Sequence, residues 1–321
     1  MPEQEVLSGD FPTVASPNPE EPSAMAMAIE KAKETGAEVV MASDPDADRI
    51  GLVIRDNNGE YVLINGNQIV MIFLNYLMTR NTELGTLTGN EYIVKTIVTT
   101  ETIRTIAEAQ HIKMYDCFTG FKWIAHVMRE NEGKARYLGG GEESYGFLAE
   151  DFVRDKDSVS AISLMAEIAA WAKDKGLNMT DMLIDIYMKY GFSREKGISL
   201  VRKGKSGAEE IIALMKQFRE NPPKEIAGSP VVTVKDFQSL VETNVATGET
   251  KKLDMPATSN VLQYYTADRT KVSVRPSGTE PKIKFYIEVH DTLASADEYK
   301  ATEARADEKI NRIAKEFGIT K

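Results

Sequence analysis

Three aspartates alternate along one short segment, at Asp44, Asp46 and Asp48. They follow the apolar run 38–42, which is typical of a buried parallel strand, so we expect them on a loop at the carboxyl end of that strand. Three carboxylates placed in this way can converge on one hard cation, and Mg²⁺ is the natural candidate. Arg49 comes next, and its guanidinium could hold a phosphoryl group beside the metal. The alternatives are a solvated acidic turn and, for Arg49, a surface ion pair.

The spacing of these aspartates excludes a calcium loop of the EF-hand type. With Asp44 at the first loop position, Arg49 stands where the sharp turn needs glycine. Arg55 then stands where the bidentate glutamate belongs. We call residues 44–49 the aspartate loop.

A second segment, residues 275–282, lies between two apolar runs that predict strands. Gly278 allows backbone amides to turn toward an anion, and Ser277 and Thr279 offer hydroxyl donors. Arg275 and Lys282 add positive charge at the two ends. These groups predict a phosphate-binding loop, here called the arginine loop. The alternative is a long hairpin turn rich in proline and glycine.

A third segment, residues 139–147, contains a glycine run and then Glu142 and Ser144. Glycines let a ligand approach the backbone, while a carboxylate and a hydroxyl can bind the hydroxyl groups of a sugar. The glycine run could equally be a flexible exit from a strand. We call residues 142–147 the glutamate loop. Lys122 follows a glycine turn, a position at which most lysines are exposed to solvent.

The other chemically versatile residues have weaker patterns. The three histidines show no metal-ligand spacing and are expected to be structural or surface residues: His111, His126 and His290. Cys117 has no neighbour in the sequence that would mark it as a nucleophile.

The elements expected to position these segments alternate between helix and strand, which indicates an α/β fold. The pattern predicts helices over 24–35, 68–78, 101–109, 158–173 and 179–190, and strands over 50–54, 61–64 and 92–98. From about residue 191 it changes to strands around 231–234 and 272–289, with a last helix over 294–317. We therefore expect α/β domains over 1–64 and 65–190 and an α+β domain over 191–321. The proline-rich stretch 11–20 is expected to be an ordered loop or linker.

Composition limits the class of protein. The 321 residues are 42% hydrophobic and 27% charged, which is typical of a folded chain with two or three domains. The formal net charge of −10 gives no general support for nucleic-acid binding. A single cysteine excludes a disulfide framework within the chain and indicates a reducing compartment. With no signal peptide and no long apolar run, the chain is expected to be cytoplasmic and not bound to membrane.

Taken together, the aspartate, glutamate and arginine loops resemble, in order, the magnesium, sugar-recognition and phosphate-binding loops of the α-D-phosphohexomutases, which include phosphoglucomutases and phosphomannomutases. The match runs over nearly the whole chain. The common Ser-Gly-His of the sugar loop is replaced by Ser144-Tyr145-Gly146-Phe147, which is similar to the bacterial glucose-type branch close to phosphopentomutases. The resemblance implies consecutive α/β domains with a C-terminal α+β domain, and leaves glucose, mannose and pentose phosphates open as substrates.

The same resemblance implies a site and a mechanism. Asp44, Asp46 and Asp48 would bind Mg²⁺, Arg49 would stabilise charge, and Lys122 would act as acid or base. Sugar hydroxyls would be held by Glu142 and Ser144, and the remote phosphate by Arg275, Ser277, Gly278 and Thr279. A phosphoserine would exchange its phosphoryl group with a hexose monophosphate through a bisphosphate intermediate.

The phosphoserine of this family lies in an N-terminal domain, far upstream of the metal loop. Ser16 is only 44 − 16 = 28 residues before Asp44 and is followed by Pro17, so it is rejected as the nucleophile. The resemblance thus implies a C-terminal fragment that binds substrate without turnover and needs the missing phosphoserine domain as its partner. Two alternatives are a noncatalytic module that binds sugar phosphate and Mg²⁺, and a phosphatase similar to the haloacid dehalogenases. The phosphatase interpretation leaves the arginine loop unexplained.

Overall fold

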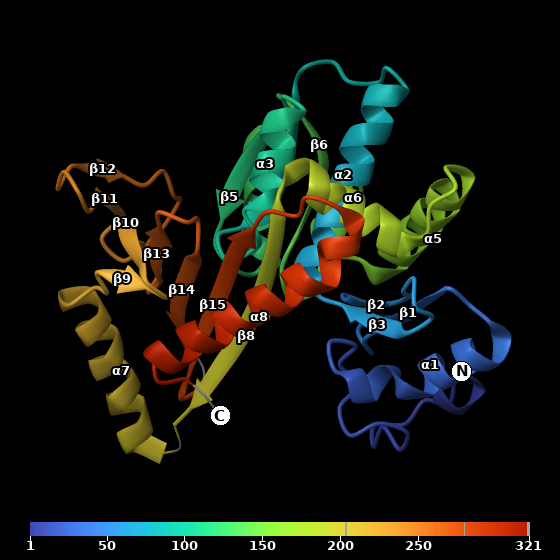
Figure 1. Cartoon of the computed structure of the whole chain (residues 1–321), viewed down its shortest axis with the longest axis horizontal. Helices are drawn as coiled ribbons and strands as arrows, with labels where there is room; N and C mark the ends of the chain where they lie inside the picture. Colours follow the sequence, from blue (N-terminus) through green and yellow to red (C-terminus); the bar gives the residue numbers. More distant parts are fainter. Residues whose placement is uncertain (203, 279, 320–321) are drawn as a thin grey trace. The chain divides into compact units, whose positions relative to one another are not determined.

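The computed structural model describes residues 1–202, 204–278 and 280–319. The chain forms two compact units, Met1–Tyr190 and Gly191–Lys321 (Figure 1). The first unit has two sheets and the second has one, each with packed helices. Thr279, one of the predicted phosphate ligands, lies outside the described residues.

The first unit begins with a short 3-10 turn, η1 (Pro2–Gln4), and the helix α1 (Pro22–Thr35). A proline in the first turn starts α1, and Gly36 ends it with a φ of 71°. Three antiparallel strands follow in the order β1-β2-β3: β1 (Val39–Ser43), β2 (Ile50–Arg55) and β3 (Tyr61–Ile64). Met25 and Ala32 of α1 pack against Val40 and Val53, which joins the helix to this sheet.

The prediction of a buried parallel strand over 38–42 is wrong. β1 pairs with β2 in the antiparallel direction, from Val39 opposite Ile54 to Ser43 opposite Ile50. Most of its side chains are only half-buried. A parallel connection needs a dozen or more residues, whereas the aspartate loop returns the chain at once as a hairpin.

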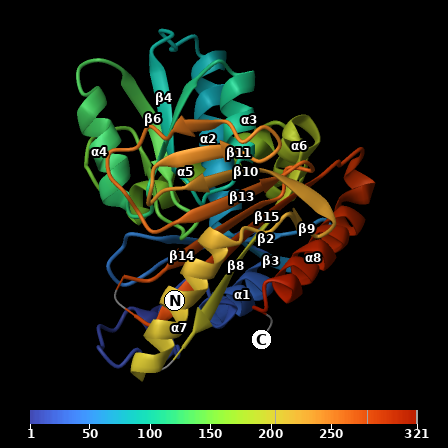
Figure 2. The same ribbon diagram turned by 90° about the vertical axis from the view of Figure 1, so that its left-hand side faces the viewer.

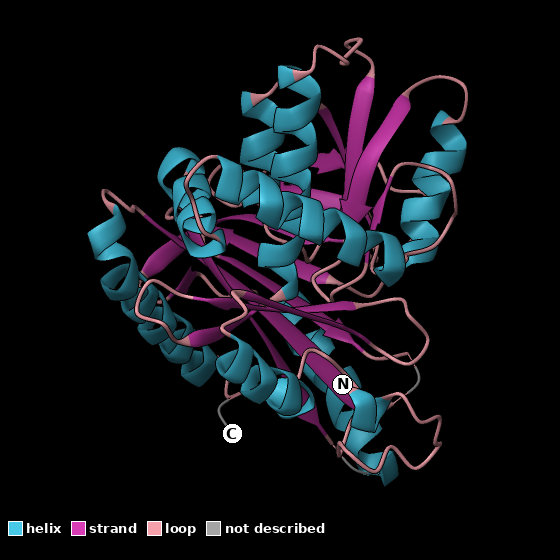
Figure 3. Cartoon of the chain, turned by 90° about the vertical axis from the view of Figure 1, so that its right-hand side faces the viewer, coloured by secondary structure: helices cyan, strands magenta, loops and turns pink. Residues whose placement is uncertain are grey.

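The second sheet of this unit has the order β5-β4-β6-β7. β4 (Glu91–Thr96) runs parallel to both β5 (Lys113–Cys117) and β6 (Arg136–Gly141), and β7 (Phe147–Ala149) is antiparallel to β6. Helices cover both faces of this sheet (Figure 3). α2 (Gly66–Glu83) places Phe73 against Phe147 on one face, while α4 (Phe121–Asn131) packs on Leu148 and its neighbours on the other.

The remaining helices of the first unit are α3 (Thr102–Ala109), α5 (Ser158–Asp174) and α6 (Met179–Tyr190). α5 packs against β7 of the second sheet and also against β1 of the first. This helix therefore joins the two sheets and brings the loops at their ends close together.

The second unit contains one sheet in the order β12-β11-β10-β13-β14-β15-β8, with β9 paired to β10. Its strands are β8 (Phe192–Val201), β9 (Glu225–Ile226), β10 (Ser229–Asp236), β11 (Val241–Asn244), β12 (Thr250–Lys252), β13 (Leu262–Thr266), β14 (Lys271–Pro276) and β15 (Lys282–Asp291). The other elements are α7 (Gly204–Glu220), η2 (Ala296–Glu298) and α8 (Tyr299–Glu316), drawn in Figure 2. Phe285 of β15 contacts Phe218 of α7 and Phe317 after α8, so both helices cover one face of this sheet.

The helices and strands predicted from the sequence are present, with small shifts at their ends. The expected fold class, α/β with a C-terminal α+β part, is confirmed. The helices α4 and α7 and the strands β5, β7, β8, β9, β11, β12 and β13 were not predicted from the sequence. In the described part of the chain, no helix is both long and apolar enough to span a membrane.

Candidate functional site

The aspartate loop is a tight hairpin connection whose shape depends on Asp44. Its Oδ1 accepts hydrogen bonds from the backbone N–H groups of Asp48 and Arg49, each at 3.0 Å. The chain turns through Ala47, whose φ of 56° lies in the left-handed region that favours glycine. A non-glycine residue held there at an energetic cost is common where a loop serves a function.

The three aspartates can hold a metal ion together. One carboxylate oxygen from each of Asp44, Asp46 and Asp48 lies within 4.8 Å of the others. Asp48 Oδ1 is buried and accepts no hydrogen bond from any described residue. Burial raises the pKa of Asp44, and the negative charge of Asp48 raises it further. The two backbone hydrogen bonds from Arg49 and Asp48 lower this pKa but do not cancel the rise. Crowded, partly dehydrated oxygen ligands of this kind fit Mg²⁺.

Arg49 lies beside this group of carboxylates. Its Nη1 is 2.8 Å from Glu20 Oε1, and its Nε is 3.6 Å from Asp44 Oδ2 and 3.7 Å from Asp48 Oδ1. The ion pair with Glu20 matches the alternative prediction that Arg49 forms a surface ion pair. The contacts with the two aspartates nevertheless place the guanidinium next to the predicted metal ligands.

Lys156 is a member of the site that sequence reasoning missed. Its Nζ lies 2.6 Å from Asp48 Oδ2. Burial lowers the pKa of Lys156, but the hydrogen bond and the charge of Asp48 outweigh it and raise the pKa above its ordinary value of 10.5. Lys156 belongs to residues 154–157, where positive and negative side chains alternate. This pattern is typical of a solvated loop, so the local sequence does not indicate that Lys156 is a site residue.

The glutamate loop follows the carboxyl end of β6. Glu142 is only 5% exposed, and its Oε1 accepts a hydrogen bond from the backbone N–H of Gly120 at 2.7 Å. Burial raises the pKa of Glu142, against the lowering effects of that amide, Lys156 and Arg49. The loop closes through a 2.9 Å hydrogen bond from Glu142 N to Gly146 O. Ser144 is half-buried in the turn between them.

The aspartate and glutamate loops lie against each other. The backbone N–H of Ile50 donates to Tyr145 O at 3.1 Å, and that of Ser158 donates to Ala47 O at 3.0 Å. Tyr145, like Ala47, has a positive φ, of 70°. The structure therefore brings together two of the three segments that the sequence singled out.

The glycine run before the glutamate loop is not a flexible exit. Gly139, Gly140 and Gly141 belong to β6 and are buried. A Cβ on Gly140 would lie 2.5 Å from Val94 O, and one on Gly141 would lie 2.6 Å from Val70 Cγ2. Glycine is needed here because the neighbouring strand and helix pack directly on the backbone.

Lys122 lies on the first turn of α4, two residues after Gly120. Its side chain is exposed, and its Nζ is 5.5 Å from the centroid of the Trp123 ring. The hydrogen bond from Gly120 to Glu142 fixes this turn to the glutamate loop. A role in proton transfer stays a prediction.

A partly buried ion cluster lies at the carboxyl ends of β4 and β5 in the second sheet. Lys95 of β4 is fully buried, and its Nζ lies 2.9 Å from both Glu101 Oε1 and Asp116 Oδ1. Arg104 contacts the same two carboxylates. These charges hold the ends of β4 and β5 and the start of α3 in place.

The arginine loop belongs to the second unit, where it joins β14 to β15. Arg275 stands opposite Lys284 in the antiparallel pair, so two cations share one face of the hairpin. Ser277 N donates to Lys282 O and Lys282 N to Glu280 O, each at 2.7 Å. These two amides are thus used by the turn itself, as the hairpin alternative expected. Gly278 is exposed, and a Cβ on it would meet no atom within 4 Å.

The other candidates have structural surroundings. His111 is exposed. The ring of His126 stands edge-on to the ring of Trp123, with 5.9 Å between the ring centroids. His290 Nε2 is 3.0 Å from Glu288 Oε1. Cys117 is buried, and burial raises the pKa of its thiol. A buried thiol of this kind is a poor nucleophile.

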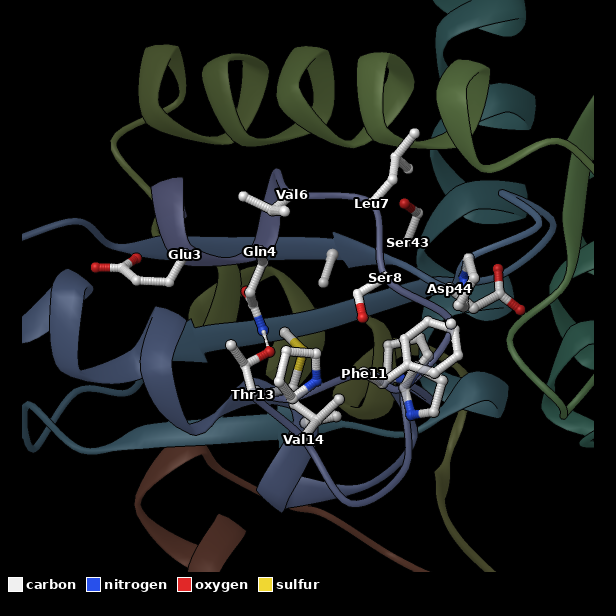
Figure 4. Close-up of a pocket in the computed structure, with 18 residues that line it drawn as sticks. Glu3, Gln4, Val6, Leu7, Ser8, Phe11, Thr13, Val14, Ser43 and Asp44 are labelled. Atoms are coloured by element: carbon white, nitrogen blue, oxygen red, sulfur yellow. Dashed lines mark hydrogen bonds between the residues drawn. The ribbon is translucent and has the colours of Figure 1, made fainter.

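A cavity of about 680 Å³ lies beside the aspartate loop (Figure 4). Its wall is formed by the N-terminal residues from Glu3 to Val14 and by the end of β1, with Ser43 and Asp44 at one side. Among the predicted site residues that the structure describes, Asp44 alone lines it.

The sequence belongs to the phosphoglucomutase/phosphomannomutase family. Sequence models of that family match residues 1–59 as alpha/beta/alpha domain II, 65–190 as alpha/beta/alpha domain III and 220–306 as the C-terminal domain. The predicted family is thereby confirmed.

Similar proteins include two curated phosphoglucomutases. The chain is 37% identical to that of Staphylococcus epidermidis and 35% identical to that of Staphylococcus aureus. Each alignment covers 87% of this chain, against 50% and 49% of the relative. The chain thus spans about half the length of the curated relatives it matches.

Solved structures show the same fold. One is the open form of pp63/parafusin, a phosphoglucomutase from Paramecium. It matches with a TM-score of 0.59 and 16% identity, and the match covers 96% of this chain and 52% of the Paramecium chain. A phosphoglucomutase/phosphomannomutase family protein from Burkholderia thailandensis gives 0.60 at 20% identity, over 97% and 54% of the two chains.

Proposed function

We propose that this chain supplies the metal, sugar and phosphate sites of a hexose phosphate mutase that interconverts hexose 1-phosphate and hexose 6-phosphate, with glucose as the sugar. The main support is that the aspartate and glutamate loops lie against each other in one unit. Ile50, directly after the aspartate loop, donates to Tyr145 O, and Lys156, which pairs with Asp48, packs on Gly146. A metal site beside a buried carboxylate that can hold sugar hydroxyls suits a phosphorylated sugar.

In this proposal, each side chain has a separate task. Asp44, Asp46 and Asp48 hold Mg²⁺, which when bound neutralises charge on the phosphoryl oxygens. Arg49 adds positive charge beside the transferred group. Glu142 and Ser144 orient the sugar hydroxyls, and Lys122 moves a proton at the hydroxyl that gains or loses the phosphoryl group.

The arginine loop would bind the phosphate that is not being transferred. The opposed cations Arg275 and Lys284 repel each other across the hairpin, and an anion between them would relieve this. Ser277, Gly278 and Thr279 complete the proposed loop. We further propose three domains, over 1–64, 65–190 and 191–321, and a reducing, cytoplasmic location.

The phosphoryl donor of the proposed reaction is a phosphoserine on a further domain. This chain alone is then expected to bind substrate without turnover. The haloacid-dehalogenase-like alternative is disfavoured, because the aspartate loop is a hairpin between antiparallel strands and the chain belongs to another family.

Three assays on the 321-residue chain test this proposal. Titration with glucose 1-phosphate in the presence of Mg²⁺ should show saturable binding, with neither glucose 6-phosphate formed nor phosphate released. Release of inorganic phosphate would support the phosphatase instead. Formation of glucose 6-phosphate by this chain alone would contradict the need for an added donor.

A further inference from the structure

We propose that Lys156 is a positioning residue that makes the aspartate loop select Mg²⁺ over Ca²⁺. It does so by occupying one oxygen of Asp48, so that this carboxylate can offer a metal only its other oxygen. The inference rests on the proposed function, in which the three aspartates bind a divalent cation.

The two oxygens of Asp48 have different surroundings. Oδ2 is 2.6 Å from the Lys156 ammonium, whereas Oδ1 is buried and has no hydrogen-bond donor among the described residues. Arg49 Nε, at 3.7 Å, is the nearby cation on that side. A metal can therefore use Oδ1 without breaking an existing hydrogen bond, but it can use Oδ2 only by displacing Lys156.

Asp44 is restricted in a similar way. Its Oδ1 accepts two backbone hydrogen bonds that shape the loop, and its Oδ2 is 3.6 Å from Arg49 Nε. Neither of these carboxylates can readily bind a metal through both oxygens. Mg²⁺ needs only six ligands in a small octahedron, whereas Ca²⁺ takes six to eight oxygens at longer distances and commonly uses carboxylates through both oxygens.

The backbone next to Lys156 is fixed by hydrogen bonds, and its side chain packs on the glutamate loop. Asp157 N donates to Phe147 O at 3.1 Å, and Ser158 N donates to Ala47 O at 3.0 Å. The Asp157 side chain caps α5 by accepting from Val159 N and Ser160 N. The stem of Lys156 lies over Gly146, where a Cβ would be 2.4 Å from its Cδ. The side chain is 18% exposed, so its ammonium is fixed rather than free in solvent.

Calorimetric titration of the 321-residue chain with MgCl₂ and with CaCl₂ tests this role. We expect the unaltered chain to bind Mg²⁺ more tightly. In K156M both oxygens of Asp48 become available, so the preference for Mg²⁺ should fall about tenfold, which is ~1.4 kcal/mol. K156R keeps a cation on Asp48 and should keep the preference.

K173M is the matched control. Lys173 also belongs to the α5 region and forms an ion pair, 3.2 Å from Glu38 Oε2, but both side chains are exposed. This variant should leave both affinities unchanged. If thermal unfolding shows that K156M does not fold, K156L replaces it, because leucine is uncharged and cannot donate a hydrogen bond to Asp48.

The outcomes separate this inference from the proposed function. If the unaltered chain binds no Mg²⁺, the metal site of the proposed function fails. If Mg²⁺ binds and a folded K156M or K156L keeps the original preference over Ca²⁺, the selectivity role of Lys156 is wrong while the metal site stands. If K173M also lost the preference for Mg²⁺ over Ca²⁺, the selectivity role of Lys156 would likewise be wrong.

Discussion

The backbone N–H of Gly120 donates to Oε1 of Glu142 at 2.7 Å, which ties the turn before α4 to the glutamate loop. Glu142 is almost fully buried, and burial raises its pKa even though Gly120, Lys156 and Arg49 all favour the charged form. A carboxylate kept in such a place at a cost to stability is typical of a binding or catalytic site.

Replacing Glu142 by glutamine should separate the effect of this carboxylate on the stability of the fold from its effect on sugar phosphate binding. Because the pKa of Glu142 is raised in the folded state, its contribution to stability is present at low pH and is lost as pH rises through the folded-state pKa. E142Q keeps an acceptor for Gly120 without the charge. Its Tm at pH 7 should equal or exceed that of the unaltered chain, while affinity for glucose 1-phosphate should fall at least about tenfold.

E142A is the control, because it also removes the acceptor for Gly120. Its Tm should be lower than that of E142Q. Equal sugar phosphate affinity in E142Q and the unaltered chain would argue against a role for this carboxylate in binding.

Asp46 can be tested as a metal ligand without disturbing the fold, because its side chain is exposed. D46N should have an unchanged Tm in EDTA. With Mg²⁺ at a hundred times its dissociation constant, the unaltered chain should gain about 2.7 kcal/mol in its free energy of unfolding. D46N should lose most of this gain, measured by thermal unfolding with and without MgCl₂. A full Mg²⁺ response in D46N would exclude Asp46 as a ligand.

Gly66 should be essential for the position of the glutamate loop. A Cβ on this residue would lie 2.0 Å from Glu143 O and 2.8 Å from Tyr145 N. The N-terminus of α2 cannot easily move away, because Asn65 and Gln68 form a reciprocal capping box. G66A should therefore lower the free energy of unfolding by about 1–3 kcal/mol or more and weaken sugar phosphate binding.

G197A provides the comparison, since a Cβ on Gly197 of β8 would meet no atom within 4 Å. Denaturant unfolding should show little change for it. Equal stability of the two variants would mean that the loop adapts to the added methyl group.

Much of the fold could be predicted because its signals are local. Apolar runs marked most strands, and the periodic helices followed from their spacing. The direction of β1 could not be predicted, because parallel and antiparallel strands share the same apolar pattern and only the partner strand decides between them. β5 and α4 were missed because Lys113 and Asp116 interrupt a short strand and because α4 is polar on its outer face.

The aspartate and glutamate loops could be identified from residue types at short spacing. The contact between Lys156 and Asp48 could not, because it joins segments far apart in the chain. The same holds for Glu20 with Arg49 and for Gly120 with Glu142. Sequence spacing therefore located the ligands, while tertiary structure determines which oxygens are free.

Asp268 should make the second unit sensitive to acid. Burial alone would raise its pKa, but Lys309, Thr266 and Thr270 donate to it and hold the pKa well below the ordinary value of 3.8. Its stabilising effect is therefore complete above pH 3.8 and is lost as pH falls through the folded-state pKa. D268N should lower the Tm at pH 7 and have a smaller effect at pH 2.5, as measured by circular dichroism. An equal loss of Tm at both pH values would contradict this assignment.

The proposed function depends most on the aspartate and glutamate loops binding one phosphorylated hexose. The most direct measurement is calorimetric titration of glucose 1,6-bisphosphate with Mg²⁺ into the 321-residue chain and into D46N and E142Q. We predict one saturable site in the unaltered chain and an affinity at least about tenfold weaker in each variant, since each loses one charged contact. Unchanged affinity in either variant would remove its loop from the site, and unchanged affinity in both would contradict the shared sugar phosphate site.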